Sequence, residues 1–292
     1  TPTADLSVGQ NYHLNYPAGA FTNIGGDLSS VGIAYTFQAR SYSYQLFAIG
    51  EGNGGRLGLN NGSVDYSSPV QIPGTTWKSI DHGGDGFGAN GGNFSVVVKS
   101  DGTLWAWGTN SSGQLGQNNT TTYSSPIQIG SDTDWESTGI GIYNGFAIKT
   151  DGTAWAWGWN GRGSLGNNAT ANRSSPIQIP GTWSSLRGGR EGDSIGVKTD
   201  GTLWTWGNNE NGELGHNNRT QYSSPTQVPG TTWSGVRGAM STGQKRMHAI
   251  RTDGTLWSWG YANGGRLGLG NNTRYSSPTQ VPGTTWRSIS AA

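Results

Sequence analysis

The sequence contains no cysteine, which excludes disulfide bonds, thiolate nucleophiles and zinc sites built on cysteine. Only 12% of the 292 residues are charged, and the formal net charge is +1. So little charge offers no basic field for nucleic acid and no acidic field for a cationic partner, so no nucleic acid is expected as a partner. No run of about 18 apolar residues occurs, so we expect no membrane-spanning helix.

Catalytic and metal-binding patterns are missing as well. The spacing of the four histidines, His13, His82, His216 and His248, places no two of them on one metal ion. Neither a Gly-x-x-x-x-Gly-Lys phosphate-binding loop nor a Gly-x-Ser-x-Gly nucleophile elbow is present. We therefore predict a protein that is not an enzyme and that needs no metal and no cofactor.

Glycine and tryptophan, in contrast, are abundant, with 51 and 14 residues, and they recur in one motif. Its four full copies are DGTLWAWGTNSSGQLG (101–116), DGTAWAWGWNGRGSLG (151–166), DGTLWTWGNNENGELG (200–215) and DGTLWSWGYANGGRLG (253–268). A shorter fifth copy, LFAIGEGNGGRLG, occupies residues 46–58. A Ser-Ser-Pro-x-Gln segment and a lone tryptophan, Trp77 in the first unit, follow each copy at nearly constant distance. The chain is therefore a tandem repeat of about 50 residues.

Each repeat predicts short strands and no long helix. Asp-Gly between two β-rich runs is a strong hairpin signal, and no segment keeps an apolar period of 3.6 residues. A unit of about four short strands cannot bury its own faces alone, so neighbouring units must stack. The two tryptophans of each Trp-x-Trp segment lie on one strand face, where packing between units explains them better than ligand stacking. The repeated aspartates, such as Asp101, are expected to cap their turns.

The two ends of the chain favour a closed ring over a rod. We predict an all-β fold: a single β-propeller domain over residues 1–292, with about six four-stranded blades. It would comprise a degenerate blade (1–50), four repeats (51–108, 109–158, 159–207 and 208–260) and a half repeat (261–292). N-terminal strands would close the ring by pairing with Trp286–Ile289.

The motif DGTLWAWGTNSSGQLG resembles the repeat of the regulator of chromosome condensation family, whose members form β-propellers. The resemblance covers residues 46–292 and, less closely, 18–45. The family includes an exchange factor for a small GTPase that binds chromatin, a secreted bacterial β-lactamase inhibitor, and many bacterial, phage and environmental modules. The chain is most similar to this last group in its low charge and its loops rich in asparagine and threonine.

This resemblance implies a non-enzymatic recognition or assembly module, and we expect a structural protein on a virion or an extracellular microbial surface. Its partner would be another protein or further copies of itself. Two alternatives stay open. One is a secreted inhibitor or exchange-factor-like regulator that docks one propeller face on a protein, and the other is a carbohydrate-binding propeller that recognises a surface glycan.

Candidate partner-binding residues are those at which one repeat departs from the others, because constant positions serve the blade itself. Trp159 and Tyr261 are loop aromatics that the repeat does not require. The residue just before the recurring Leu-Gly varies between the five units: it is arginine in two of them and a different residue in each of the other three. The full set of candidates is Trp159, Tyr261, Arg56, Arg266, Arg187, Arg190, Glu191 and His82, the last within the glycine-rich excursion 81–93.

Overall fold

The computed structural model of the chain describes residues 11–15, 34–38, 44–82, 93–236 and 238–290. Within these residues every regular element is a β-strand, apart from two short 3-10 turns, η1 (Asn53–Gly55) and η2 (Asn263–Gly265). The predicted all-β class is confirmed. No helix among the described residues has the length and apolar character needed to cross a membrane.

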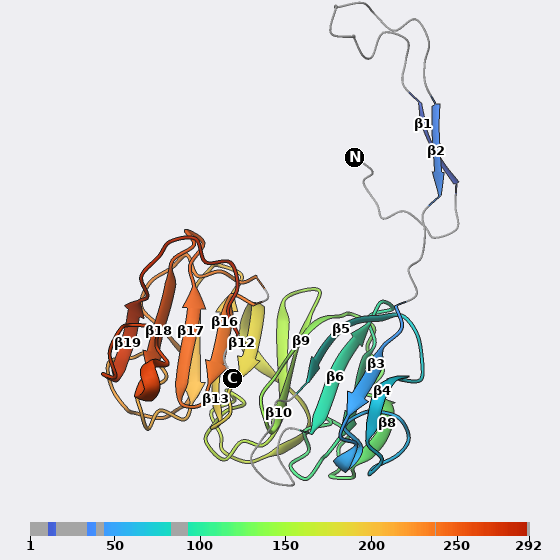
Figure 1. The fold of residues 1–292 in the computed structure, drawn as a ribbon, viewed down its shortest axis with the longest axis horizontal. Coiled ribbons are helices and arrows are strands. Elements are labelled where there is room, and N and C mark those ends of the chain that lie inside the picture. The colour runs from blue at the N-terminus through green and yellow to red at the C-terminus, as the bar shows by residue number, and fades with distance from the viewer. Residues whose placement is uncertain (1–10, 16–33, 39–43, 83–92, 237, 291–292) are drawn as a thin grey trace, which may run out of the picture. The chain divides into compact units, whose positions relative to one another are not determined.

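The chain forms two compact units, residues 1–44 and 45–292, and each is described by itself (Figure 1). In the first unit, β1 (Asn11–Asn15) pairs with β2 (Ala34–Gln38) in an antiparallel ladder that sets His13 opposite Thr36. The assignment of all 292 residues to one propeller domain stays a prediction.

The second unit consists of antiparallel sheets that follow one another in chain order (Figure 1). Its strands are β3 (Phe47–Gly50), β4 (Tyr66–Gln71), β5 (Trp77–His82), β6 (Phe94–Lys99), β7 (Leu104–Gly108), β8 (Tyr123–Gln128), β9 (Trp135–Ile140), β10 (Asn144–Lys149), β11 (Thr153–Gly158), β12 (Arg173–Gly188), β13 (Asp193–Lys198), β14 (Leu203–Gly207), β15 (Tyr222–Gln227), β16 (Met240–Gly243), β17 (Arg246–Ile250), β18 (Leu256–Gly260) and β19 (Tyr275–Gln280). We call each set of four a blade: β5–β8, β9 to the first half of β12, the second half of β12 to β15, and β16–β19.

Two blades share one sheet because strand β12 runs through both. The reason lies in the linker before the lone tryptophan, which reads Pro-Gly-Thr-Trp here and Pro-Gly-Thr-Thr-Trp before Trp77 and Trp233. In those longer linkers the second threonine takes a left-handed conformation, with φ of 68° at Thr76 and 72° at Thr232. Without that residue the chain stays extended from one blade into the next.

The Asp-Gly-Thr turns are held by a short relay of hydrogen bonds. The Asp101 carboxylate accepts hydrogen bonds from the backbone N–H (3.0 Å) and hydroxyl (2.6 Å) of Thr103, whose oxygen in turn accepts one from Trp105 Nε1 (2.8 Å). The bond from the Thr103 hydroxyl lowers the pKa of Asp101. The same relay recurs at Asp200 and Asp253. The prediction that these aspartates cap their turns is confirmed.

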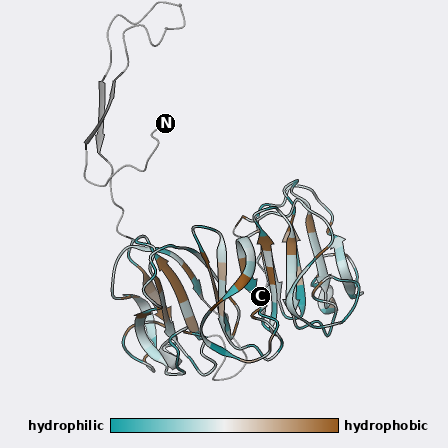
Figure 2. Cartoon of the chain, turned by 180° about the vertical axis from the view of Figure 1, so that it is seen from behind, coloured by the Kyte–Doolittle hydropathy of each residue, from teal (hydrophilic) through white to brown (hydrophobic). Residues whose placement is uncertain are grey.

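Aromatic rings fill the contacts between blades, as the repeat pattern predicted. Within the blade β5–β8, Trp77 meets Trp105 and Trp107 edge-on, with ring centroids 6.3 and 6.0 Å apart. Ile72, which follows β4, joins this cluster from the preceding sheet. Ala106, on the other face of strand β7, packs toward the tryptophans of the next blade. Hydrophobic residues lie mainly on the middle strands of the sheets (Figure 2).

A cation lies over two tryptophan rings in each blade, at the end of the second strand. Lys99 Nζ is 4.0 Å from the Trp105 ring centroid and 4.6 Å from that of Trp77. Equivalent cations occupy the other three blades, namely Lys149, Lys198 and Arg251. These residues therefore belong to the repeated framework.

Each Gly-x-Leu-Gly loop docks on the outer strand of the following blade. A Cβ added at Gly113 would lie 2.6 Å from the Ser174 Cα, and Asn118 N–H donates to the Ser174 carbonyl at 2.7 Å. The loops that begin after β3, β11 and β14 make the same contacts on Ser124, Ser223 and Ser276. In the last repeat a Cβ added at Gly265 would meet nothing within 4 Å. Among the described residues, only this last loop has no following blade to dock on.

Closure of the ring and the count of six blades are not confirmed. In the described residues, four complete blades accompany the two-stranded sheet β3–β4, whose strands correspond to the third and fourth strands of a blade. Trp286–Ile289 forms no strand there, and Ile289 N–H donates instead to the Gly238 carbonyl (2.8 Å). Most of the N-terminal residues expected to pair with this segment lie outside the described residues.

Loop docking makes a prediction that compares two equivalent glycines, both with positive φ (82° at Gly113 and 71° at Gly265). Gly265→Ala is expected to lower the free energy of unfolding by about 1–2 kcal/mol, the cost of a left-handed alanine. Gly113→Ala should cost about 1–3 kcal/mol more, because its methyl group overlaps the Ser174 backbone. Urea denaturation of both variants measures the difference, and equal losses would show that this docking contributes nothing to stability.

Candidate functional site

The connections that follow the Trp-x-Trp-Gly strands gather at one edge of the sheets, which we call the loop face. Strand register puts Gly158 opposite Asn144 and Gly260 opposite Arg246, so the connections before β10 and β17 share this edge. The Asp-Gly-Thr turns lie at the opposite edge, the turn face. All eight candidate partner-binding residues lie in connections at the loop face, or in a strand within two residues of such a connection.

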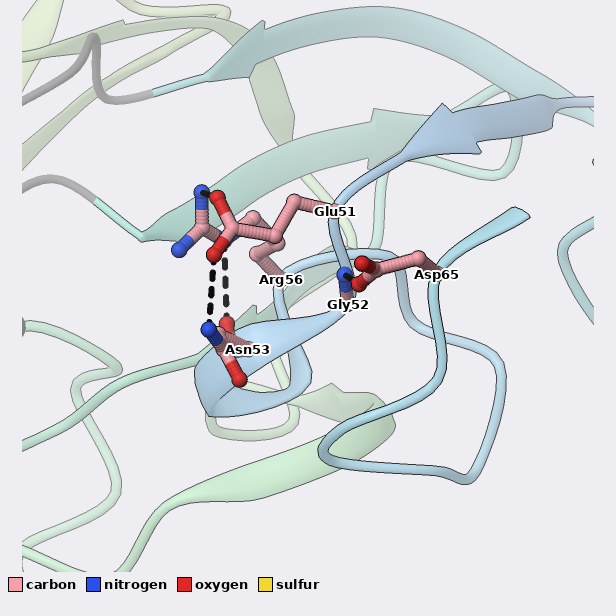
Figure 3. A network of polar contacts seen from close by, with 5 residues as sticks. All are labelled: Glu51, Gly52, Asn53, Arg56 and Asp65. Atoms are coloured by element: carbon pink, nitrogen blue, oxygen red, sulfur yellow. Dashed lines mark hydrogen bonds and ion pairs between the residues drawn. The ribbon is translucent and has the colours of Figure 1, made fainter. Parts of the chain in front are cut away.

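In the first repeat the loop face is neutralised by its own side chains (Figure 3). Arg56 pairs with the Glu51 carboxylate at 3.2 Å and donates through Nε to the Asn53 carbonyl at 2.9 Å. The Asp65 carboxylate accepts a hydrogen bond from Gly52 N–H at 3.0 Å. Arg56 therefore serves a local network, and this loop carries two acids for one arginine.

Trp159 packs on the loop that contains two other candidates. Its half-buried ring lies 6.2 Å from the Tyr143 ring, and a Cβ added at Gly192 would lie 2.4 Å from it. The structure thus brings Trp159 next to the connection that holds Arg190 and Glu191. One face of the indole is used for packing between blades, which the sequence did not reveal.

Arg187 and His82 lie apart from this contact. Arg187, in β12, lines a cavity of about 60 Å³ between the first strands of three blades, with Thr138 and Val236 among the other lining residues. A cavity of this size holds one or two water molecules. His82 ends β5, with its backbone opposite Ser95. Most of the predicted excursion 81–93 lies outside the described residues.

The last repeat forms an open hollow of about 510 Å³ at the loop face. Its lining includes Asn211, Gln244, Lys245, Tyr261, Arg266 and Arg274, and we call it the last-repeat pocket. The structure thus brings the predicted residues Tyr261 and Arg266 together. The sequence analysis missed Lys245 and Arg274, although the residue before each Ser-Ser-Pro strand varies between repeats and could have pointed to Arg274.

A second feature that the sequence analysis missed is a pair of buried carboxyl groups. Asp193 and Glu213 are completely buried, and burial together with the Glu213 charge raises the pKa of Asp193 to about 7. Burial also raises the pKa of Glu213. The signal was again departure from the repeat, because Glu213 stands where another unit has Gln114 and Asp193 where others have Phe94 or Asn144. Among the residues the structure describes, no three histidine or acidic side chains are arranged to hold a metal ion.

Asp193 makes stability depend on pH in a definite direction. Because its pKa is higher in the folded chain than in the unfolded chain, folded protein binds the proton more tightly, and stability falls as pH rises from about 4 to about 7. Asp193→Asn keeps the shape of the protonated acid, so it should raise the free energy of unfolding by a few kcal/mol at pH 8 and little at pH 4.

Thermal denaturation of both proteins across this range measures the effect. Burial lowers the pKa of His248 to about 4, so His248 makes the folded chain less stable as pH falls from 6.5 to 4. This contribution is the same in both proteins and cancels when their stabilities are compared. A variant no more stable than the parent chain at pH 8 would contradict the assignment of a buried, proton-binding carboxyl group.

Solved structures with the same fold are β-propellers of this repeat type. Human WBSCR16 superposes with a TM-score of 0.70 at 19% identity, over 89% of this chain and 67% of that one. Prp20p from Saccharomyces cerevisiae superposes with a TM-score of 0.66 at 19% identity, over 82% of this chain and 59% of that one. Yeast RCC1 (Prp20) bound to Kap60 superposes with a TM-score of 0.64 at 19% identity, over 78% of this chain and 54% of that one. The chain thus spans little more than half the length of the yeast protein.

These structures correct the predicted location. The chain was expected on an extracellular or virion surface, yet the similar structures belong to human and yeast proteins, and the yeast protein was characterised for binding to Gsp1p and histones. They point away from an extracellular or virion location, and with it from the predicted structural role on such a surface.

The sequence model of the regulator of chromosome condensation (RCC1) repeat matches this chain four times, at residues 101–141, 151–188, 200–239 and 253–292. Each match begins at the aspartate of an Asp-Gly-Thr turn, so it starts where the repeated framework described above starts. Together the matches cover more than half of the sequence. The chain belongs to the regulator of chromosome condensation repeat family.

Proposed function

We propose that this chain is a protein-recognition module without catalytic activity, which binds its partner through the loop face. One observation carries the proposal: residues that vary between repeats gather on that face, whereas the constant residues build the contacts between blades. The position before each Leu-Gly shows the division. At Arg56 the backbone carbonyl accepts a hydrogen bond from Trp107 of the next blade (3.0 Å), and the side chain at this position differs between repeats. It reaches the surface at Arg56 and Arg266, whereas its counterparts Gln114, Ser164 and Glu213 are buried.

The comparisons support protein binding as the class of function. The yeast Prp20 structures concern a protein that binds Gsp1p and histones and one bound to Kap60. This chain covers 59% or less of those proteins at 19% identity, so the support extends to protein recognition by the fold and not to any of those partners.

The charge distribution favours a regulator-like module that docks one face on a protein over a carbohydrate-binding propeller. A lectin site needs exposed aromatic rings, but Trp159 packs against Gly192 and Tyr143, and the Arg274 guanidinium covers Tyr261 at 4.7 Å. Charged residues gathered on one face are instead typical of a protein-docking surface. Lys245 and Arg266 lie on the loop face, where they line the last-repeat pocket.

The proposal predicts that variants of the two faces differ in binding. The immobilised full chain is used to isolate proteins from a lysate of its own source, and the affinity of each purified candidate is then measured by calorimetry. The loop-face variant replaces both Arg162 and Tyr261 by alanine. Arg162 forms an exposed ion pair with Glu210 on the loop face (3.0 Å). This variant should bind a true partner with an affinity about tenfold lower or more.

The matched control is Lys78→Ala, which removes an equally exposed pair with Glu136 (2.7 Å) near the turn face and should leave the affinity unchanged. If a partner no longer binds the Lys78→Ala variant but still binds the loop-face variant, the assignment of binding to the loop face would be wrong. Absence of any protein that binds the purified chain directly would overturn the function itself.

A further inference from the structure

The last-repeat pocket carries an unbalanced positive charge in a chain whose formal net charge is only +1. Lys245, Arg266 and Arg274 all line it, and no carboxylate among the described residues does. The nearby acids are occupied elsewhere: Glu210 pairs with Arg162 at 3.0 Å, and Glu213 is fully buried, with one oxygen accepting Asn211 N–H. The charge of Lys245 reaches Glu213 and lowers the pKa of that carboxyl group, against the effect of burial. Arg266 and Arg274 line the same hollow, and the lining holds no described carboxylate to pair with them.

The first repeat shows the same loop with its arginine paired to an acid. Its segment GEGNGGRLG aligns with GYANGGRLG of the last repeat, so Arg56 corresponds to Arg266 and Glu51 to Tyr261. The residue before Tyr-Ser-Ser-Pro is Asp65 in the first repeat and Arg274 in the last. Two acids that neutralise the first loop are thus replaced by a neutral ring and a second arginine (Figure 3).

The arrangement also holds the cationic groups in place for a ligand. The Arg274 guanidinium lies over the Tyr261 ring, with its Cζ 4.7 Å from the ring centroid, and this cation–π contact restrains it. Arg266 is oriented by one hydrogen bond, from its Nη1 to the Gln244 amide oxygen at 3.3 Å. Lys245 has φ of 60°, a conformation that favours glycine, so this turn keeps a lysine at a cost in backbone energy.

We propose that the last-repeat pocket binds an acidic segment of a protein partner, with a carboxylate or phosphate group held between Arg266, Arg274 and Lys245. Planar guanidinium groups hold such oxyanions through paired N–H···O hydrogen bonds. The volume of about 510 Å³ admits one or two acidic side chains. The inference rests on the proposed protein-recognition function and names the chemistry of what is recognised.

Fluorescence anisotropy of a labelled hexaglutamate peptide with the full chain at low ionic strength tests the proposal. The peptide should bind, a hexalysine peptide should not, and added salt should weaken the binding. A phosphoserine peptide of equal length shows whether phosphate is preferred to carboxylate, and tighter binding of either one supports the proposal. Arg266→Ala should weaken the binding about tenfold or more.

Two further variants make the test specific to this pocket. Tyr261→Glu places a carboxylate where the first repeat has Glu51, so it should neutralise Arg266 and also weaken the binding at least tenfold. Arg56→Ala is the matched control and should change the affinity by less than about twofold, because Glu51 already neutralises Arg56. Thermal denaturation of each variant checks that the fold is retained.

Unchanged affinity in Tyr261→Glu, an equal loss in Arg56→Ala, or equal binding of hexalysine would overturn the proposal. Its failure is distinct from failure of the proposed function. A protein partner that needs the loop face while acidic peptides do not bind would sink only the acidic-ligand inference. Specific peptide binding by a chain that binds no protein would sink only the protein-recognition function.

Discussion

The structure depends on one contact between successive blades: a tryptophan indole N–H of each blade donates to a loop carbonyl of the blade before it. Trp107, Trp157, Trp206 and Trp259 donate in this way over 2.7 to 3.0 Å. The acceptors are the backbone oxygens of Arg56, Gln114, Ser164 and Glu213, which lie just before the Leu-Gly of each loop. Buried indole N–H groups require such a partner, so the contact fixes the spacing of the blades as well as their packing.

Because that contact uses the backbone, the acceptor side chain can differ from one repeat to the next, although those of Gln114, Ser164 and Glu213 are buried. The same position can therefore carry a self-neutralised arginine in Arg56, a buried acid in Glu213 and a pocket-lining arginine in Arg266 without loss of the framework. In the last repeat the loop docks on no described blade, so its surroundings are also open. The framework and the candidate binding chemistry are thus separated within one motif, one in the main chain and the other in the side chains.

Much of this could be predicted from the sequence, and what could not has physical reasons. The repeat register predicted the strands, the capped turns and the packing of the Trp-x-Trp rings between units, because those features need only local pattern and constant spacing. Comparison of repeats also found Tyr261 and Arg266. It did not find Lys245, which reaches the pocket from a different hairpin, or the burial of Asp193, which depends on contacts across blades. Closure of the ring, predicted from the two chain ends, depends on pairings that lie largely outside the described residues.

Hydrogen–deuterium exchange of the full chain, with and without a purified protein partner, tests the separation of the two faces most directly. Partner binding is expected to slow exchange at the loop face, in residues 244–245 and 260–274 above all, and to leave the turns at 99–103 and 198–202 unchanged. Protection confined to those turns, with the loop face exchanging as in the free chain, would contradict this separation.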